Sequence, residues 1–302
     1  MIHFDNITKI FKSELLTQPY VALNEVSFEV PAGSMVGFLG ANGAGKTTSL
    51  KIIMDFIRPT SGKVVFENSL GKTREEIFRN IGYLPERPYF YQNLTGSEFL
   101  HFMGEISEIS KTEIKSQISY WAPRFKIDHA MQRELKTYSK GMLQRIGFMS
   151  AILHRPKLII LDEPLSGLDP IGRKEIKDVI VEVHKAGQTV FFSSHIIPDI
   201  EEICDRVVFL KEGKLVYDGT VASLLGSGSD QGFIMKVRSN SNIEFETPFK
   251  QKMDLPDNLT TFVVHSEFKD KFLNEVIQKR LNLVGLEPIQ SSLEEIFYRT
   301  KG

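Results

Sequence analysis

The chain has 302 residues, 41% of them hydrophobic and 25% charged, with a formal net charge of -1 at pH 7. This balance predicts a globular protein large enough for two domains, and it argues against a chain dedicated to binding a nucleic-acid backbone. The single cysteine, Cys204, excludes an internal disulfide and favours a reducing compartment. Residues 1–10 lack the basic and apolar regions of a secretory signal, and no apolar run approaches the ~20 residues of a membrane-spanning helix. We therefore expect a soluble protein.

The first 225 residues alternate between predicted strands and helices, the pattern of an α/β core with a largely parallel sheet. Up to residue 84 the pattern predicts, in chain order, strands at 26–30 and Met35–Leu39, a helix at Lys46–Phe56, and strands at Lys63–Glu67 and Ile81–Leu84. Residues Leu94–Leu153 are predicted to be mostly helical, with a break at Trp121-Ala122-Pro123. After them come a strand at Leu158–Leu161, a helix at Ile171–Ala186, a strand at Thr189–Ser193, and a hairpin of Arg206–Lys211 and Lys214–Tyr217. The helical stretch interrupts the alternation, so residues 90–155 are predicted to form a helical subdomain.

The rest of the chain is predicted to form a small α+β domain at 233–302, joined by a linker at 226–232. The linker contains Gly226-Ser227-Gly228-Ser229, a run of small residues typical of flexible connections. Beyond it, strands are predicted at Phe233–Val237 and Thr261–Val264, and helices at Lys269–Leu281 and Leu293–Arg299.

A glycine-rich loop lies between the predicted strand Met35–Leu39 and the helix after it. The loop fits G-x-x-x-x-G-K-[ST] and consists of Gly40, Ala41, Asn42, Gly43, Ala44, Gly45, Lys46, Thr47 and Thr48. Glycines let backbone N–H groups turn toward phosphate oxygens, and the helix adds its positive N-terminal end. Lys46 brings a charge to the outer phosphates, and the hydroxyl of Thr47 suits a Mg²⁺ ion. The loop therefore predicts a site for ATP and Mg²⁺.

Two acidic residues, Asp162 and Glu163, end the apolar strand Leu158–Leu161. In a protein with such a phosphate loop, an Asp at this place holds Mg²⁺, directly or through water. The adjacent Glu163 is a candidate general base for the attacking water. Taken alone, the pair also fits an ordinary strand that ends in acids, so this prediction depends on the phosphate loop.

Three further segments follow in a characteristic order. The first contains Ser139, Lys140, Gly141 and Met142 before the acidic strand, the second is Ser166-Gly167-Leu168-Asp169 just after it, and the third is Ser193-Ser194-His195 at the end of the next strand. In residues and order they resemble the signature segment, the D-loop and the switch histidine of ATP-binding cassette (ABC) proteins. The resemblance covers about residues 1–225. It implies a P-loop NTPase cassette with a RecA-like core, an antiparallel β subdomain and a helical subdomain, followed here by the α+β domain.

The resemblance also implies how these segments cooperate. In this family two cassettes close head to tail around two ATP molecules, so the signature residues contact a γ-phosphate bound to the other subunit from the start of a helix. His195 would contact the γ-phosphate and hold the attacking water in line with Glu163. We expect a homodimer because one chain carries every motif.

An aromatic ring near the start of the cassette stacks on adenine in this family. Phe11 stands at that place and is the predicted residue. The following segment, Lys12–Pro19, is longer than the family pattern, so Tyr20 is an alternative. A purely structural role for Phe11 is the other alternative.

Two residues depart from the family pattern. Glu86 stands where a glutamine usually touches Mg²⁺ and senses the membrane subunit. A carboxylate still suits Mg²⁺, but it cannot donate a hydrogen bond while it is ionised. Lys140 stands where glycine is commonest, and it either adds charge near the γ-phosphate or faces solvent.

A cassette without a membrane span requires separate integral membrane permease subunits. The resemblance therefore implies a peripheral place on the cytoplasmic face of the inner (plasma) membrane. The tail Ser292–Phe297 reads close to the C-terminal end of the ATPases of bacterial ABC-2 exporters, which favours export over import. The aromatic run Tyr89-Phe90-Tyr91 lies where the family docks its membrane partner, with ordinary packing of the rings as the alternative.

Two other classes of protein compete with this interpretation. A soluble ABC ATPase that acts on DNA or ribosomes would carry a long coiled coil or a second cassette, and the chain has neither heptads nor a second phosphate loop. No nucleic-acid partner is expected. A module that binds ATP without hydrolysing it would have no need for both Glu163 and His195.

Overall fold

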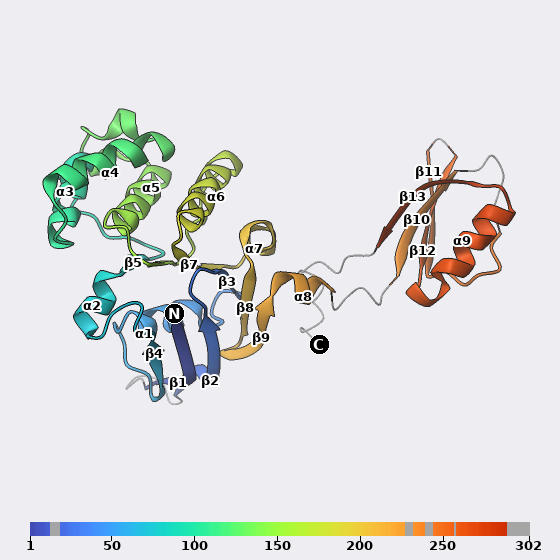
Figure 1. Cartoon of the computed structure of the whole chain (residues 1–302), viewed down its shortest axis with the longest axis horizontal. Coiled ribbons are helices and arrows are strands. Elements are labelled where there is room, and N and C mark those ends of the chain that lie inside the picture. Colours follow the sequence, from blue (N-terminus) through green and yellow to red (C-terminus); the bar gives the residue numbers. More distant parts are fainter. Residues whose placement is uncertain (13–18, 227–231, 239–243, 257, 289–302) are drawn as a thin grey trace. The chain divides into compact units, whose positions relative to one another are not determined.

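A computed structural model describes residues 1–12, 19–226, 232–238, 244–256 and 258–288 (Figure 1). The chain divides into two compact units, Met1–Thr220 and Val221–Gly302. Residues 227–231 of the predicted linker and the predicted helix Leu293–Arg299 lie outside the described residues. Within the described ranges, no helix is both long and apolar enough to cross a membrane.

The larger unit is built on a six-stranded sheet of order β5-β6-β7-β3-β8-β9. Its strands are β3 (Met35–Leu39), β5 (Ile81–Leu84), β6 (Leu158–Leu161), β7 (Thr189–Ser194), β8 (Arg206–Lys211) and β9 (Lys214–Thr220). All pairs are parallel except β8 with β9, which confirms the predicted largely parallel sheet. β3 and β6 are buried along their whole length, which explains their continuous apolar sequences. Because β3, β6 and β7 are parallel, the residues that follow them meet at one edge of the sheet.

An antiparallel sheet of order β2-β1-β4 shares its core with the six-stranded sheet. It consists of β1 (Ile2–Phe11), β2 (Tyr20–Val30) and β4 (Ser61–Phe66). The ring centroid of Phe28 on β2 lies 5.3 Å from that of Phe38 on β3 and 5.8 Å from that of Phe191 on β7. β1 was not predicted from the sequence, because register shifts between Phe4 and Ile10 interrupt the two-residue alternation that identifies a strand.

Helices gather in one group at the predicted helical subdomain (Figure 1). The helices of this group are α3 (Gly96–Ile106), α4 (Lys111–Arg124) and α5 (Lys140–Ile152), and those elsewhere in the larger unit are α1 (Lys46–Ile53), α2 (Arg74–Arg79), α6 (Pro170–Lys185) and α7 (Ile197–Ile203). Short 3₁₀ turns at Asp128–Ala130 and Leu135–Thr137 connect α4 to α5. The family's helical subdomain is therefore present between β5 and β6.

The helix break predicted at Trp121-Ala122-Pro123 is wrong, because α4 continues through Pro123. A proline inside a helix costs about 3 kcal/mol because it lacks the N–H and crowds the preceding turn. Here it lies in the last turn of α4, next to a buried tryptophan. The indole N–H of Trp121 donates to Oε1 of Gln117 at 3.1 Å. The helix ends at Arg124, one residue after the proline, so the predicted break lies slightly too early in the chain.

The smaller unit is an α+β fold, as predicted. It contains α8 (Val221–Gly226), β10 (Phe233–Arg238), β11 (Gln251–Leu255), β12 (Leu259–Val264), α9 (Lys269–Gln278) and β13 (Asn282–Pro288). The four strands form an antiparallel sheet of order β11-β12-β10-β13. Phe272 and Val276 of α9 pack on Met235 and Phe262 of this sheet.

Candidate functional site

The phosphate loop connects β3 to α1, as the sequence predicted, and two of its glycines adopt backbone conformations that other residues avoid. Gly43 has φ +83° and Gly45 has φ +106°. A Cβ atom built on Gly45 would lie 2.6 Å from Cδ2 of Leu23 and 2.8 Å from the carbonyl oxygen of Ala22. Both the dihedral angle and the available space therefore require glycine at position 45.

The ammonium group of Lys46 is held inside this loop. Lys46 is buried, and Nζ donates to the carbonyl oxygens of Gly40 at 2.6 Å and Ala41 at 3.3 Å. Nζ also lies 3.2 Å from Oε1 of Glu163. The loop thus holds one positive charge at the start of α1, where phosphate groups bind in proteins of this loop type.

The carboxylate of Glu163 lies between Lys46 and His195. Its Oε2 is 2.8 Å from Nδ1 of His195, which follows β7. Glu163 follows β6, and β6 and β7 are neighbours in the sheet. The backbone of Glu163 is left-handed, with φ +50°, a conformation that is uncommon for a residue with a side chain and is often found at functional sites.

The carboxyl group of Asp162 is buried beside this pair. Burial raises the pKa of Asp162 above its ordinary value, the negative charges of Glu163 and Glu86 add to the rise, and the nearby hydroxyls of Ser193 and Thr47 act in the opposite direction. Oδ2 of Asp162 is buried and has no hydrogen-bond partner among the described residues. This carboxylate oxygen, together with the nearby Thr47 hydroxyl, has the donor chemistry that Mg²⁺ prefers.

A cavity of about 290 Å³ is bordered by the phosphate loop, Glu163 and His195, whereas Asp162 is not part of its lining. Its lining consists of Tyr20, Ala41, Asn42, Gly43, Gly45, Lys46, Thr47, Thr48, Glu86, Glu163, Ser166 and His195. The loop, the candidate base and the switch histidine are thus brought together, along with Glu86, whose side chain is 46% exposed. Tyr20 lines the cavity and Phe11 does not, although the two residues are paired across β1 and β2.

The signature residues lie at the start of α5 and outside the lining of this cavity. Ser139 caps the helix, and its hydroxyl accepts the N–H of Met142 at 3.3 Å. Gly141 and Lys140 face the D-loop of the same chain. A Cβ on Gly141 would lie 3.3 Å from Leu168, and a Cβ on Gly167 would lie 2.6 Å from Nζ of Lys140.

The D-loop connects the cavity to α6. Ser166 lines the cavity, Gly167 has φ +72°, and Oδ1 of Asp169 accepts the N–H of Gly172 at 2.8 Å as the N-cap of α6. Lys140 therefore lies against the D-loop, an arrangement that the sequence did not suggest.

The role of Ser193 was not predicted from the sequence. Its hydroxyl donates to Oδ1 of Asp162 and accepts the backbone N–H of Glu163. A place for Ser193 in the site could have been inferred from its position two residues before His195. Alternate residues at a strand end point to the same side. The partner of that hydroxyl depends on strand pairing, which the sequence pattern did not specify.

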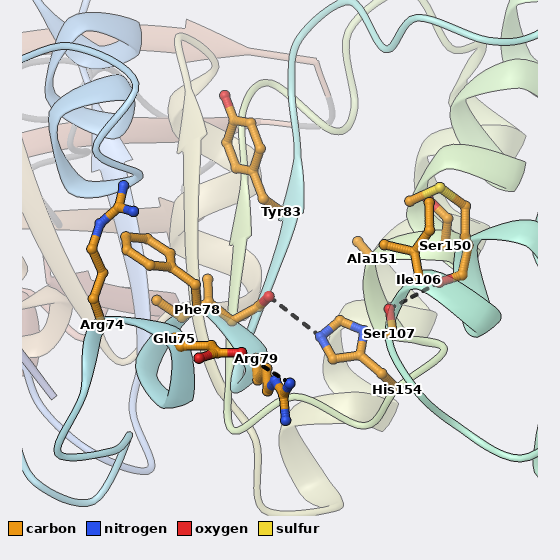
Figure 2. Close-up of a pocket in the computed structure, with 12 residues that line it drawn as sticks. Arg74, Glu75, Phe78, Arg79, Tyr83, Ile106, Ser107, Ser150, Ala151 and His154 are labelled. Atoms are coloured by element: carbon orange, nitrogen blue, oxygen red, sulfur yellow. Dashed lines mark hydrogen bonds and ion pairs between the residues drawn. The ribbon is translucent and has the colours of Figure 1, made fainter.

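A second cavity, of about 570 Å³, lies beside β5 and does not contain the phosphate loop (Figure 2). Figure 2 shows Arg74, Arg79 and His154 around it. Both arginines have acidic partners, Asp55 for Arg74 and Glu75 for Arg79. Burial lowers the pKa of His154, which favours the neutral ring. With its arginines paired and its histidine neutral, this cavity lacks the charge of a phosphate site.

Known proteins resemble this chain in sequence and in fold. Residues 23–166 match the family model described as ABC transporter. An ABC transporter ATP-binding protein of Synechocystis sp. is 34% identical over 298 residues, which cover 97% of this chain and 82% of that protein. The bacitracin transport ATP-binding protein BcrA of Bacillus licheniformis is 40% identical over 215 residues, 70% of this chain and 69% of BcrA.

A solved structure agrees with these sequence matches. It is described as the ATP binding subunit of an ABC transporter, and it superposes with a TM-score of 0.65 at 28% identity, covering 75% of this chain and 92% of the other. The long match to the Synechocystis protein and the shared cassette fold lead to one conclusion. This chain belongs to the ATP-binding subunits of ABC transporters, and it is an ATPase.

Proposed function

We propose that two copies of this chain close head to tail, so that each ATP lies between the phosphate loop of one copy and the signature segment of the other. The separation of the two segments within one chain supports this arrangement. Ser139 to Met142 do not line the cavity of their own chain, although Ser139 caps a helix whose N–H groups suit a phosphate. A site that is completed by a second copy would hydrolyse ATP only as a dimer.

The proposed chemistry assigns one task to each side chain. Glu163 removes a proton from the attacking water, His195 orients that water and contacts the γ-phosphate, and Lys46 binds the outer phosphates. Thr47 and Asp162 would hold Mg²⁺, with Glu86 as a further candidate ligand. When bound, Mg²⁺ supplies positive charge to the phosphate oxygens. The observation that carries this proposal is the position of the Glu163 carboxylate, 3.2 Å from Lys46 and 2.8 Å from His195.

A concentration series of the purified chain tests the dimer. ATP turnover per molecule should rise with protein concentration and then reach a plateau, because the active form requires two copies. Turnover that is independent of concentration, together with a monomer at every concentration by light scattering, would contradict a homodimer.

Tyr20 is proposed to stack on adenine, because it lines the cavity and Phe11 does not. Tyr20→Ala is expected to weaken ATP binding by about 1–3 kcal/mol, or roughly 5–150-fold, the usual contribution of base stacking. Phe11→Ala should change the affinity by less than about threefold. Calorimetric titration with ATP measures both variants, and tripolyphosphate, which has no adenine, should bind equally to all three proteins. A larger loss for Phe11→Ala would reverse the assignment.

The chain is further proposed to dock on integral membrane permease subunits and to drive export from the cytoplasmic face of the membrane. A groove of about 740 Å³ supports a docking surface, since its lining includes Tyr89, Tyr91 and Phe102 and Tyr89 is 91% exposed. Exposed aromatic rings of this kind are common at protein interfaces. Export is supported by the bacitracin transport role that BcrA's name states and by the tail Ser292–Phe297, which lies outside the described residues.

Co-purification from detergent-solubilised membranes of the native host tests this docking surface. A tagged copy of the chain should carry along a membrane protein with several spans in stoichiometric amount. Replacing Tyr89 and Tyr91 together by alanine should weaken this association by about 30-fold, the effect of losing ~2 kcal/mol at an interface hot spot, and so lower the recovered amount. Tyr120→Ala, an exposed tyrosine on α4, is the matched control. Recovery of ribosomal or DNA-bound proteins instead would favour the soluble ATPase class.

A further inference from the structure

Ser193 joins the two acidic residues of the site through one hydroxyl group. Its Oγ donates to Oδ1 of Asp162 at 2.7 Å and accepts the backbone N–H of Glu163 at 2.8 Å. A serine hydroxyl has one donor and two acceptor positions, so it makes both bonds at once. Ser193 is completely buried. Solvent therefore does not compete for these two bonds.

The bond to Asp162 fixes the plane of its carboxylate. Rotation about the terminal bond of an Asp side chain has a broad, roughly two-fold preference, so a partner must select one orientation. Ser193 takes Oδ1, and Oδ2 is left buried without a hydrogen-bond partner among the described residues. The hydroxyl thus determines which oxygen of Asp162 remains available for a cation.

The bond to Glu163 anchors its backbone. Glu163 lies two residues after the end of β6, and its φ of +50° turns the chain away from the strand. Its N–H is buried, and a buried N–H without a partner is costly. Lys46 and His195 orient the carboxylate of Glu163, whereas Ser193 holds the main chain that carries it.

We propose that Ser193 is a positioning residue of this ATPase, which orients Asp162 for Mg²⁺ and anchors the backbone of the base Glu163. The proposal rests on the roles given above to Asp162 and Glu163. Ser193 and His195 then have separate roles. His195 acts at the nucleotide, and Ser193 acts on the two acidic residues that follow β6. Loss of the hydroxyl should weaken metal binding and slow turnover without weakening the binding of ATP by the phosphate loop.

Ser193→Ala tests the proposal through metal binding, which does not depend on activity. Mn²⁺ affinity is measured by electron paramagnetic resonance with a non-hydrolysable ATP analogue bound, and it should fall about 10–100-fold, as for other residues that orient metal ligands. At saturating Mg²⁺, kcat should fall while KM for ATP changes little. Binding of ATP in excess chelator should equal that of the wild type, which shows that the variant is folded at the phosphate loop.

Ser194→Ala is the matched control. Ser194 is also buried and lies one position along β7, but its hydroxyl bonds to the backbone of Ile196 instead of an acid. It should keep Mn²⁺ affinity within about twofold of the wild type. Ser193→Thr, which retains the hydroxyl, should recover most of the affinity that Ser193→Ala loses. If the alanine variant does not fold, Ser193→Cys takes its place and should also lower Mn²⁺ affinity, because a thiol is only a weak donor and acceptor.

The outcomes separate this inference from the proposed function. If Ser193→Ala unfolds at lower urea but binds Mn²⁺ with wild-type affinity, Ser193 is only structural and the inference is overturned. The same conclusion follows if Ser193→Thr loses as much affinity as Ser193→Ala. A wild-type protein that binds neither Mn²⁺ with nucleotide nor ATP alone would instead overturn the proposed site itself.

Discussion

Glu163→Gln is expected to lower the rate of ATP hydrolysis by about 10²–10⁴-fold, the usual contribution of a positioned general base. Glutamine keeps the size of the side chain but does not accept the proton of the attacking water. ATP affinity should stay the same or rise, because Oε1 of Glu163 lies 3.2 Å from Nζ of Lys46 and competes with phosphate for that ammonium. The variant should therefore accumulate as an ATP-bound dimer, seen by size-exclusion chromatography in MgATP and by steady-state phosphate release.

Glu108→Gln is the control for this experiment. Glu108 is exposed and pairs with Arg79, outside the lining of the nucleotide cavity. Its replacement should leave turnover unchanged, which shows that the loss at position 163 is not a general effect of removing a carboxylate. Wild-type turnover in Glu163→Gln would assign the base to another residue.

Lys46→Ala is expected to weaken ATP binding on the order of 100-fold, since removing one partner of a buried charge pair costs 2–5 kcal/mol or more. Lys46 is the charged group that the phosphate loop encloses, and it bonds to the carbonyl of Gly40 in the same loop. Titration with ATP in the absence of metal isolates this effect from that of Mg²⁺. Hydrolysis by Lys46→Ala should be lost at ATP concentrations that are too low to saturate its weakened site.

Lys51→Ala provides the comparison within the same helix. Lys51 is exposed in the last turn of α1, and its replacement should leave the affinity for ATP unchanged. Urea unfolding of Lys46→Ala checks that the loop variant is folded, because the deletion also removes two hydrogen bonds to loop carbonyls. Undiminished ATP binding by a folded Lys46→Ala variant would contradict the phosphate-loop assignment.

The strands that carry the site were predictable because their signal is local. β5 and β6 begin and end where the sequence placed them, since continuous apolar runs are characteristic of buried parallel strands. β1 was missed because its register shifts disrupt the alternation, and β13, which begins just after the predicted helix Lys269–Leu281, was not predicted either. The break expected at Trp121-Ala122-Pro123 was wrong because α4 continues through these residues and ends at Arg124.

The residues of the candidate site also fall into those that the sequence predicted and those that it could not distinguish. The phosphate loop, the acids after β6 and the histidine after β7 were predicted as site residues from residue type and order along the chain. Tyr20 and Phe11 were not distinguishable by sequence, because they are partners across two antiparallel strands and only one of them lines the cavity. Lys140 and Gly167 likewise lie close together although they belong to different segments, and no periodicity in the sequence predicts this proximity.

By itself, the sequence determined the phosphate-loop pattern, the strand ends that carry the acids and the order that identifies the family, because each of these is encoded in a short run of neighbouring residues. Only the tertiary structure decided which aromatic ring lines the cavity and which oxygen of Asp162 has no hydrogen-bond partner in the described part of the chain. Ser193 and Asp162 are 31 residues apart and meet through the pairing of β6 with β7. Contacts of this kind depend on strand order and register, which arise when the whole core packs.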